Sequence, residues 1–225
     1  MWVGVAVWLA ALPAAGGSAS AQTAPARRPS HALEVGASAL WVGSTDFGSA
    51  TASLIKPDGS NLNLFQTTST LGAGTGLEVN VGLPITRSLS AEASAAWARA
   101  DLRSSVSADF EDAASLTVTE RLSRVTVEGA ALWTVFERGH TSVFARGSVG
   151  WMREIVGDGS LFDDGVVASA GGGVKYWFHD RRAGKGRRLG LRADARVSGR
   201  SSAITLGNQS RRFSPVIAGG IVFGF

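Results

Sequence analysis

The chain lacks cysteine, and only its N-terminus carries a long apolar run. None of its 225 residues can form a disulfide, supply a thiolate metal ligand or carry a lipid-modified cysteine. Beyond the N-terminal run, no apolar stretch reaches the ~20 residues that a helical membrane span requires. Any membrane crossing by the rest of the chain must therefore be made by strands.

A large charge excess of one sign is also missing. The formal net charge is +4, although the pI is near 10.3. The basic residues fall in turns and at strand ends and do not form one helical stripe, so we expect no nucleic-acid partner.

The N-terminus has the features of an export signal. Residues 1–15 are apolar and uncharged, and small residues follow them up to Ala19-Ser20-Ala21. This pattern is typical of a signal peptide with an A-x-A cleavage site, although no Lys or Arg precedes the apolar run. The run is shorter than a retained membrane helix would be. We predict a signal peptide at residues 1–21, a short periplasmic segment at 22–30 and one domain at 31–225.

The last segment alternates with a period of two. Phe225, Phe223, Ile221 and Ile217 share one face, and small or apolar residues share the other. Seven more segments have strand-like character and a length suited to tilted membrane strands. The eight predicted strands are 33–42, 71–83, 89–100, 116–135, 143–152, 166–178, 189–198 and 213–225. Their connections alternate between short turns and longer loops rich in Gly, Ser and Asp, and the even count places both mature ends in the periplasm.

Alternation alone does not distinguish a membrane barrel from a soluble barrel of lipocalin type. The polar faces carry small residues with a few charges, as in Gly74, Gly76 and Glu78. Such faces favour a confined polar interior over a water-exposed surface. Aromatic residues on the apolar faces lie at both strand ends, as in the girdles of membrane barrels. They are Trp41, Trp97, Trp151 and Phe213 at the outer end, and Trp133, Tyr176, Phe178, Phe223 and Phe225 at the inner end.

With its export signal, eight segments and terminal Phe, the chain resembles the OmpA- and OmpX-type barrels of the outer membrane protein β-barrel domain family. The resemblance implies an all-β fold, an eight-stranded antiparallel up-and-down transmembrane β-barrel in the bacterial outer membrane, without a cofactor. It also implies that Ile221, Phe223 and Phe225 act as a signal for the barrel-assembly machinery. Adhesins, anchors, narrow pores and lipid-modifying enzymes share this architecture, so function must be argued from sites.

The predicted interior has balanced charge. Because isolated buried ions are costly, five acids and five bases should pair there and plug the barrel. They are Glu34, Glu78, Glu92, Glu128 and Asp194 with Arg124, Arg146, Lys175, Arg192 and Arg196. A rearrangement of these pairs that opens a narrow passive channel is the alternative.

Four arginines share the lipid-facing side just beyond the outer girdle: Arg99, Arg121, Arg153 and Arg211. Arginine pairs well with phosphate oxygens, so we expect contacts with lipopolysaccharide besides other outer-membrane lipids. Ordinary solvated loop arginines are the alternative.

The first long loop contains two strand-like runs, 50–56 and 61–67, around Pro57-Asp58-Gly59-Ser60, which predicts a projecting hairpin. A second hairpin is expected between 104–110 and 115–119. Their edges offer an extracellular protein a place for strand addition. Variable loops without a partner are the alternative.

Catalysis is not expected. His31, His140 and His179 all fall on the periplasmic side, far from the outer-leaflet sites of barrel enzymes. Asp158, Asp163 and Asp164 lack EF-hand spacing, so a solvated acidic loop is favoured over a metal site. We predict a structural or surface-interaction role, with a narrow channel as the alternative and a lipid-modifying enzyme third.

Overall fold

A computed structural model describes residues 33–107, 114–157, 161–178, 187–202 and 212–225, and the predicted signal peptide lies outside them. The described residues form strands joined by turns, and no helix among them is long and apolar enough to cross a membrane. The strands are β1 (Glu34–Val42), β2 (Thr45–Ile55), β3 (Asn61–Leu71), β4 (Gly74–Pro84), β5 (Leu89–Ser107), β6 (Leu116–Arg138), β7 (Thr141–Val156), β8 (Leu161–Trp177), β9 (Arg188–Ser202) and β10 (Arg212–Gly224).

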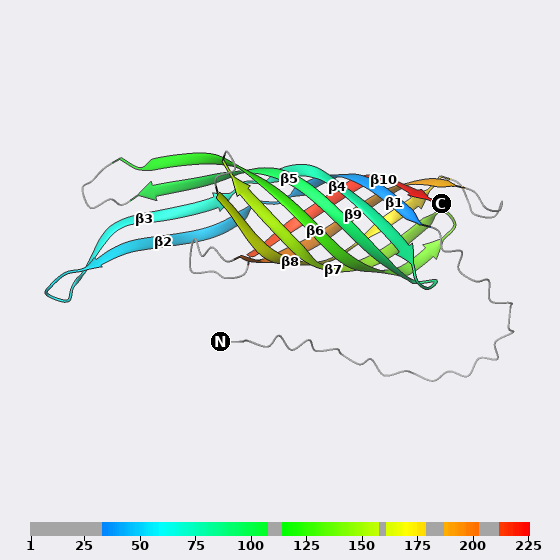
Figure 1. Ribbon diagram of the computed structural model, residues 1–225, viewed down its shortest axis with the longest axis horizontal. Helices are drawn as coiled ribbons and strands as arrows, with labels where there is room; N and C mark the ends of the chain where they lie inside the picture. The colour runs from blue at the N-terminus through cyan, green and yellow to red at the C-terminus, as the bar shows by residue number, and fades with distance from the viewer. Residues whose placement is uncertain (1–32, 108–113, 158–160, 179–186, 203–211) are drawn as a thin grey trace, which may run out of the picture.

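Eight of these strands close into a ring. The order is β1, β4, β5, β6, β7, β8, β9 and β10, and β10 pairs with β1 again, every pairing being antiparallel. Figure 1 shows these strands winding around a barrel. The predicted fold class is confirmed.

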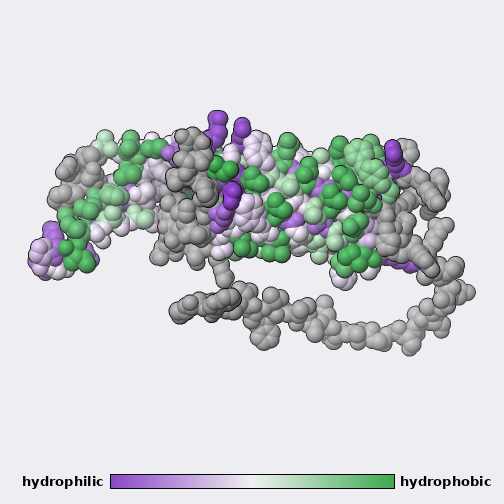
Figure 2. Space-filling view, in the orientation of Figure 1, coloured by the Kyte–Doolittle hydropathy of each residue, from purple (hydrophilic) through white to green (hydrophobic). Residues whose placement is uncertain are grey.

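The period of two in the sequence separates the two faces of the wall. On β4, Leu77 is 63% exposed and Val79 is 55% exposed, whereas Glu78 and Asn80 between them are 2% exposed. Apolar residues therefore point outward and polar ones inward, the reverse of a water-soluble barrel. Figure 2 shows apolar residues spread over the visible outer face of the barrel.

The remaining strands extend the wall at one end. Residues Gln66–Leu71 of β3 pair with Leu102–Ser107 of β5, and β2 pairs with β3. We call the sheet formed by β2, β3, residues 102–107 of β5 and residues 116–121 of β6 the projecting sheet. It extends from what we call the sheet end of the barrel (Figure 1). The opposite end, with the short turns and the last residue of β10, is the turn end.

The structure describes the paired strands of both predicted hairpins. Residues 108–113 of the second hairpin lie outside the described residues. In the first, the Asp58 carboxylate accepts hydrogen bonds from the Ser60 amide at 2.9 Å and the Ser60 hydroxyl at 2.7 Å. These bonds hold the pKa of Asp58 below its usual value. Gly59 has φ of +81°, a backbone conformation that favours glycine at this turn. The turn predicted at Pro57-Asp58-Gly59-Ser60 is therefore formed by local hydrogen bonds.

One predicted strand boundary is wrong. The second predicted strand began at Leu71, but Leu71 ends β3 and β4 starts at Gly74. Between them, the Gly72 amide donates to the Asp101 carbonyl at 2.8 Å. The break reverses the alternation, so Leu71 points inward and is buried. Several other strands are longer than predicted and take up residues that were assigned to loops.

Candidate functional site

The interior charges lie in three layers along the barrel, and the first is at the turn end. Glu34 accepts hydrogen bonds from Lys175 Nζ and from Arg188 Nη2, each at 2.5 Å. The Arg188 guanidinium lies 3.6 Å from the ring centre of the buried Trp177. A cation stacked on an indole face adds to the ion pairs. This layer ties β1, β8 and β9 together.

The central layer is the most buried. Arg192 donates to both oxygens of Glu92, at 2.5 and 3.1 Å, and to Asp194 at 3.0 Å. Arg196 donates to Asp194 at 3.1 Å and also binds Glu78. All five side chains are at most 5% exposed. Bidentate pairs of this kind offset part of the cost of burying charge.

Arg146 extends the central layer across the barrel. Its Nη2 donates to Ser94 at 3.0 Å and lies 3.5 Å from Glu128, and its Nε lies 3.6 Å from Glu92. Arg146 Nε and Nη1 have no hydrogen-bond partner, so its pairing is looser than that of Arg192. Glu128 also accepts a bond from Ser148 at 2.7 Å. The central layer thus spans the interior from β4 to β9.

The third layer lies near the sheet end. Glu154 binds Arg124, with Arg124 Nη2 at 2.6 Å, and also binds Arg200. The Arg200 guanidinium lies 4.9 Å from the ring centre of Phe47, which packs with Leu71 and Leu122 in a buried cluster. Acid and base side chains together with an apolar cluster therefore fill the barrel at this end.

The structure places all ten predicted interior charges inside the barrel and pairs each with an opposite charge. Glu154, Arg188 and Arg200 were missed because they were assigned to loops or turns. Extending the inward alternation of β7 and β9 would have identified them, since each lies an even number of residues from an inward charge of its strand.

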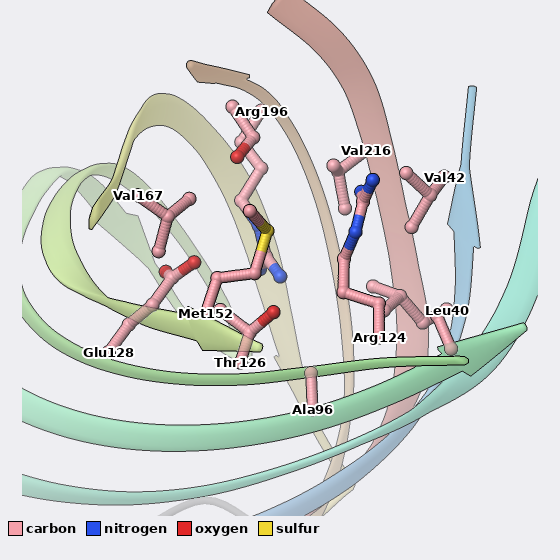
Figure 3. A pocket seen from close by; sticks show the side chains of 12 residues that line it. Leu40, Val42, Ala96, Arg124, Thr126, Glu128, Met152, Val167, Arg196 and Val216 are labelled. Atoms are coloured by element: carbon pink, nitrogen blue, oxygen red, sulfur yellow. The ribbon is translucent and has the colours of Figure 1, made fainter. Parts of the chain in front are cut away.

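Between the central and third layers, the interior is apolar where the sequence predicted a polar face. Leu40, Val42 and Val216 pack in a buried cluster with two alanines. They line a cavity of about 40 Å³, shared with Met152 and Val167 (Figure 3). Arg124, Glu128 and Arg196 also lie on its wall. A cavity of this size has room for a few water molecules.

The predicted girdle aromatics are all exposed on the outer surface. At the turn end, Tyr176 makes an edge contact with Phe178 at 5.8 Å between ring centres. Ile221, Phe223 and Phe225 also point outward, and the Phe225 amide donates to the Leu33 carbonyl at 2.9 Å where the ring closes. An assembly role for these three residues stays a prediction.

Three of the four predicted lipopolysaccharide-facing arginines, Arg99, Arg121 and Arg153, lie near the base of the projecting sheet. The Arg99 guanidinium lies 4.4 Å from the Trp97 ring centre, and that of Arg153 lies 5.0 Å from the ring centre of Trp151. Arg121 is exposed and directly opposite Asp101 in the β5–β6 register. Arg211 lies outside the described residues.

Arg153 also forms a bidentate pair with Asp164, at 2.7 and 2.9 Å. Asp164 was one of three acids weighed for calcium, and the structure gives it an arginine partner. Asp158 and the side chain of Asp163 lie outside the described part. Within that part, no three His, Asp or Glu side chains gather as metal ligands. His140 lies in the β6–β7 turn, while His31 and His179 lie outside the described residues.

No family model matches the sequence, and no curated protein matches it. Solved structures of outer-membrane proteins do match. AlkL, solved in lipid bilayers, has a TM-score of 0.51 at 13% identity, over 93% of this chain and 96% of AlkL. OprG from Pseudomonas aeruginosa has a TM-score of 0.46 at 12% identity, over 87% of this chain and 96% of OprG.

Ail of Yersinia pestis, solved with the heparin analogue sucrose octasulfate, has a TM-score of 0.41 at 11% identity. That match covers 86% of this chain and 99% of Ail. At these identities the likeness shows the fold alone. The closed ring, its outward apolar face and the match to AlkL show that this chain folds as a small eight-stranded antiparallel β-barrel of the kind found in outer-membrane proteins.

Proposed function

We propose that this barrel is a closed anchor that presents the projecting sheet for contacts at the bacterial surface. The observation that carries the proposal is the contrast between the barrel interior and the projecting sheet. The interior is filled by three charged layers and an apolar cluster, while four strands continue beyond the ring with apolar side chains exposed.

The filled interior supports the anchor role. A steady conducting path requires several buried ion pairs to separate, and leaving a buried charge without its partner costs about 3–5 kcal/mol in proteins. The central layer alone holds Arg192 and Arg196 between three carboxylates. An eight-stranded barrel has little room beyond its own side chains, so displaced groups have nowhere to go.

The projecting sheet supports the contact role because the ring closes without it. In the sheet, Ile55, Leu54, Leu116 and Val118 are 72%, 55%, 62% and 45% exposed. Apolar residues that stay exposed on an element outside the lipid-facing wall are candidates for an interaction surface. Extracellular protein is therefore the expected partner class.

Lipid contacts belong to the same proposal. Arg99, Arg121 and Arg153 lie on three neighbouring strands, and the guanidinium groups of Arg99 and Arg153 lie over outward tryptophans. Guanidinium groups at this height suit the phosphates of lipopolysaccharide. Such contacts would hold the barrel at a fixed depth and keep the projecting sheet above the membrane.

A narrow passive channel is the second candidate. It is favoured by the cavity beside Arg124, Glu128 and Arg196 and by the loose pairing of Arg146. Planar-bilayer recordings of the refolded protein at high salt separate the two. We expect a silent bilayer, and reproducible conductance steps that change in Arg146→Ala would favour the channel.

The contact role is tested on cells that display the full chain or a variant in which residues 50–67 are replaced by Asn-Gly. The trimmed residues lie beyond the ring, so thermal unfolding of the barrel should not change. We expect binding of the cells to immobilised extracellular-matrix proteins, or to one another, to fall with trimming. Equal binding by both kinds of cell would contradict the contact role.

A further inference from the structure

The polarity of the wall is reversed in the projecting sheet. On the barrel, apolar side chains face outward. Beyond the ring, the outward face is mostly polar, although it includes the exposed Ile55. The face that continues the barrel interior carries most of the apolar residues, together with Ser69, Ser104 and Glu120. The registers place Ser105, Thr117, Thr119, Thr68 and Thr70 on the outward face, and Leu116, Val118, Val106, Phe65 and Leu102 on the inward face. The sheet is thus a two-faced sheet built for water on its outward side.

Two edges of this sheet have no partner strand within the described residues. β2 pairs with β3 alone, and its base is joined to β10 by the Thr45–Ser214 hydroxyl pair at 2.5 Å. On the other side, the β6–β7 pairing begins at Leu122, so residues 116–120 of β6 pair with β5 alone. Each edge presents a row of backbone hydrogen-bonding groups.

The β2 edge also lacks the usual protection against pairing. Residues 49–55 contain no charge and no proline. The extra residue of β2 in its pairing with β3 is Phe47, below this stretch, and the second irregularity places its extra residue, Leu64, on β3. Natural proteins commonly block exposed edges with charges, prolines or bulges. An unblocked edge of this length is suited to accept another strand.

The other edge of the same sheet provides a matching strand. β2 leads away from the barrel, whereas β6 leads back toward it. Two copies that stand upright in one membrane therefore present these edges to each other in antiparallel directions. The faces match as well, because Ala50, Ala52 and Leu54 continue the inward row of Leu116 and Val118.

We propose that the β2 edge of one copy pairs with the β6 edge of a second copy in the same membrane, joining their projecting sheets into one. This inference rests on the proposed contact role and names the partner as the chain itself. The contact is head-to-tail, so each copy keeps one free β2 edge or one free β6 edge, and rows of copies can grow.

The absence of native cysteine makes the contact testable by cross-linking. Paired residues on neighbouring antiparallel strands have Cα atoms ~4.5–5.5 Å apart, within disulfide reach. Single-cysteine variants at Ala50, Ala52 or Leu54 are mixed in vesicles with variants at Leu116 or Val118 that carry a tag of different size. Mild oxidation should give dimers that contain one member of each kind. Thr68→Cys, on the inner strand β3, is the matched control and should give none.

A charge at the edge provides a second test. Ala52→Asp places a carboxylate in the apolar row of the joined sheet, whereas Ala52→Ser does not. We expect Ala52→Asp to reduce the Leu54–Val118 cross-link to the level of the Thr68 control, and Ala52→Ser to retain it. Thermal unfolding of both variants verifies that the ring is intact.

Three outcomes would overturn the inference. Dimers formed only between two β2 cysteines would mean pairing between opposed membranes. Cross-links in cells to a different protein alone would assign the edge to that protein. Absence of any cross-link, while trimming still lowers cell binding, would leave the proposed function standing without this partner. Equal cell binding by the full and trimmed chains would remove the proposed function itself.

Discussion

At the scale of single residues, each charge of the central layer has only one or two partners of opposite sign. Glu78 is one of two carboxylates that hold Arg196, and both partners are buried. Glu78→Gln leaves Arg196 with Asp194 alone. Because removing one member of a buried pair leaves an uncompensated charge, we expect a loss of about 3 kcal/mol in unfolding free energy.

The measurement is urea unfolding in lipid vesicles at neutral pH. Glu137→Gln, at an exposed position near the turn end of β6, is the matched control and should change the free energy by less than about 0.5 kcal/mol. Similar losses in the two variants would show that Glu78 is not held by its partners.

Glycine has a different part in the wall, because it lets neighbouring backbones approach. A Cβ on Gly150 would lie 2.0 Å from the Val127 carbonyl oxygen and 2.7 Å from Glu128 Cα. On the same strand, a Cβ on Gly147 would meet nothing within 4 Å. Gly150→Ala should therefore cost about 1–3 kcal/mol through overpacking, and Gly147→Ala should not. Equal urea midpoints for the two variants would contradict this account.

At the scale of elements, one aromatic residue packs the base of the β2–β3 hairpin into the barrel interior, in addition to the pairing of β3 with β5. Phe47 is the extra residue of β2 in its pairing with β3, and Gly48 beside it has φ of +77°. This local bend turns the Phe47 ring inward against Leu71, Leu122 and Arg200. Phe47→Ala removes that packing, and large-to-small changes of this kind cost about 3–5 kcal/mol.

We expect the loss to appear locally, as faster amide hydrogen exchange in β2 and β3 with unchanged exchange in β9 and β10. Phe65→Ala, which changes a partly exposed ring of the same hairpin, is the control and should have a smaller effect. Uniformly faster exchange throughout the ring would mean that Phe47 supports the whole barrel.

The sequence was sufficient for most of the ring, since an uninterrupted period of two fixes which face of β4 or β9 is buried. It was insufficient wherever that period is broken. The turn at Gly72 reverses the face of Leu71, and the extra residue in β2 turns Phe47 inward. Neither break changes the composition of the segment, so alternation alone gives no signal of it.

Interior residues were missed for a related reason. Glu154 and Arg200 continue the inward rows of β7 and β9, but the predicted strands ended before them. In the sequence, a polar residue near a strand end looks alike whether it lies in a loop or in a charged interior. Only the length of the partner strand distinguishes these two cases. Leu40 and Val42 were overlooked because the charged residues of the interior drew the prediction toward a polar face throughout.

At the scale of the whole molecule, the reversal of polarity predicts where the membrane boundary lies. Leu77 on β4 and Thr117 on β6 both face outward, yet only Leu77 lies on the apolar wall. Whether an outward position tolerates a charge therefore depends on whether lipid or water surrounds it. The strand that carries the residue and the face to which it points do not decide this.

The last prediction compares the same change at these two positions. Leu77→Arg places a guanidinium on the lipid-facing wall, where such changes cost about 2–4 kcal/mol near the bilayer centre. Thr117→Arg places it on the water-facing side of the projecting sheet, where a change within about 0.5 kcal/mol is expected. Urea unfolding in vesicles measures both. If Thr117→Arg proved as costly as Leu77→Arg, the projecting sheet would lie within lipid, and both the contact role and the edge pairing would lose their basis.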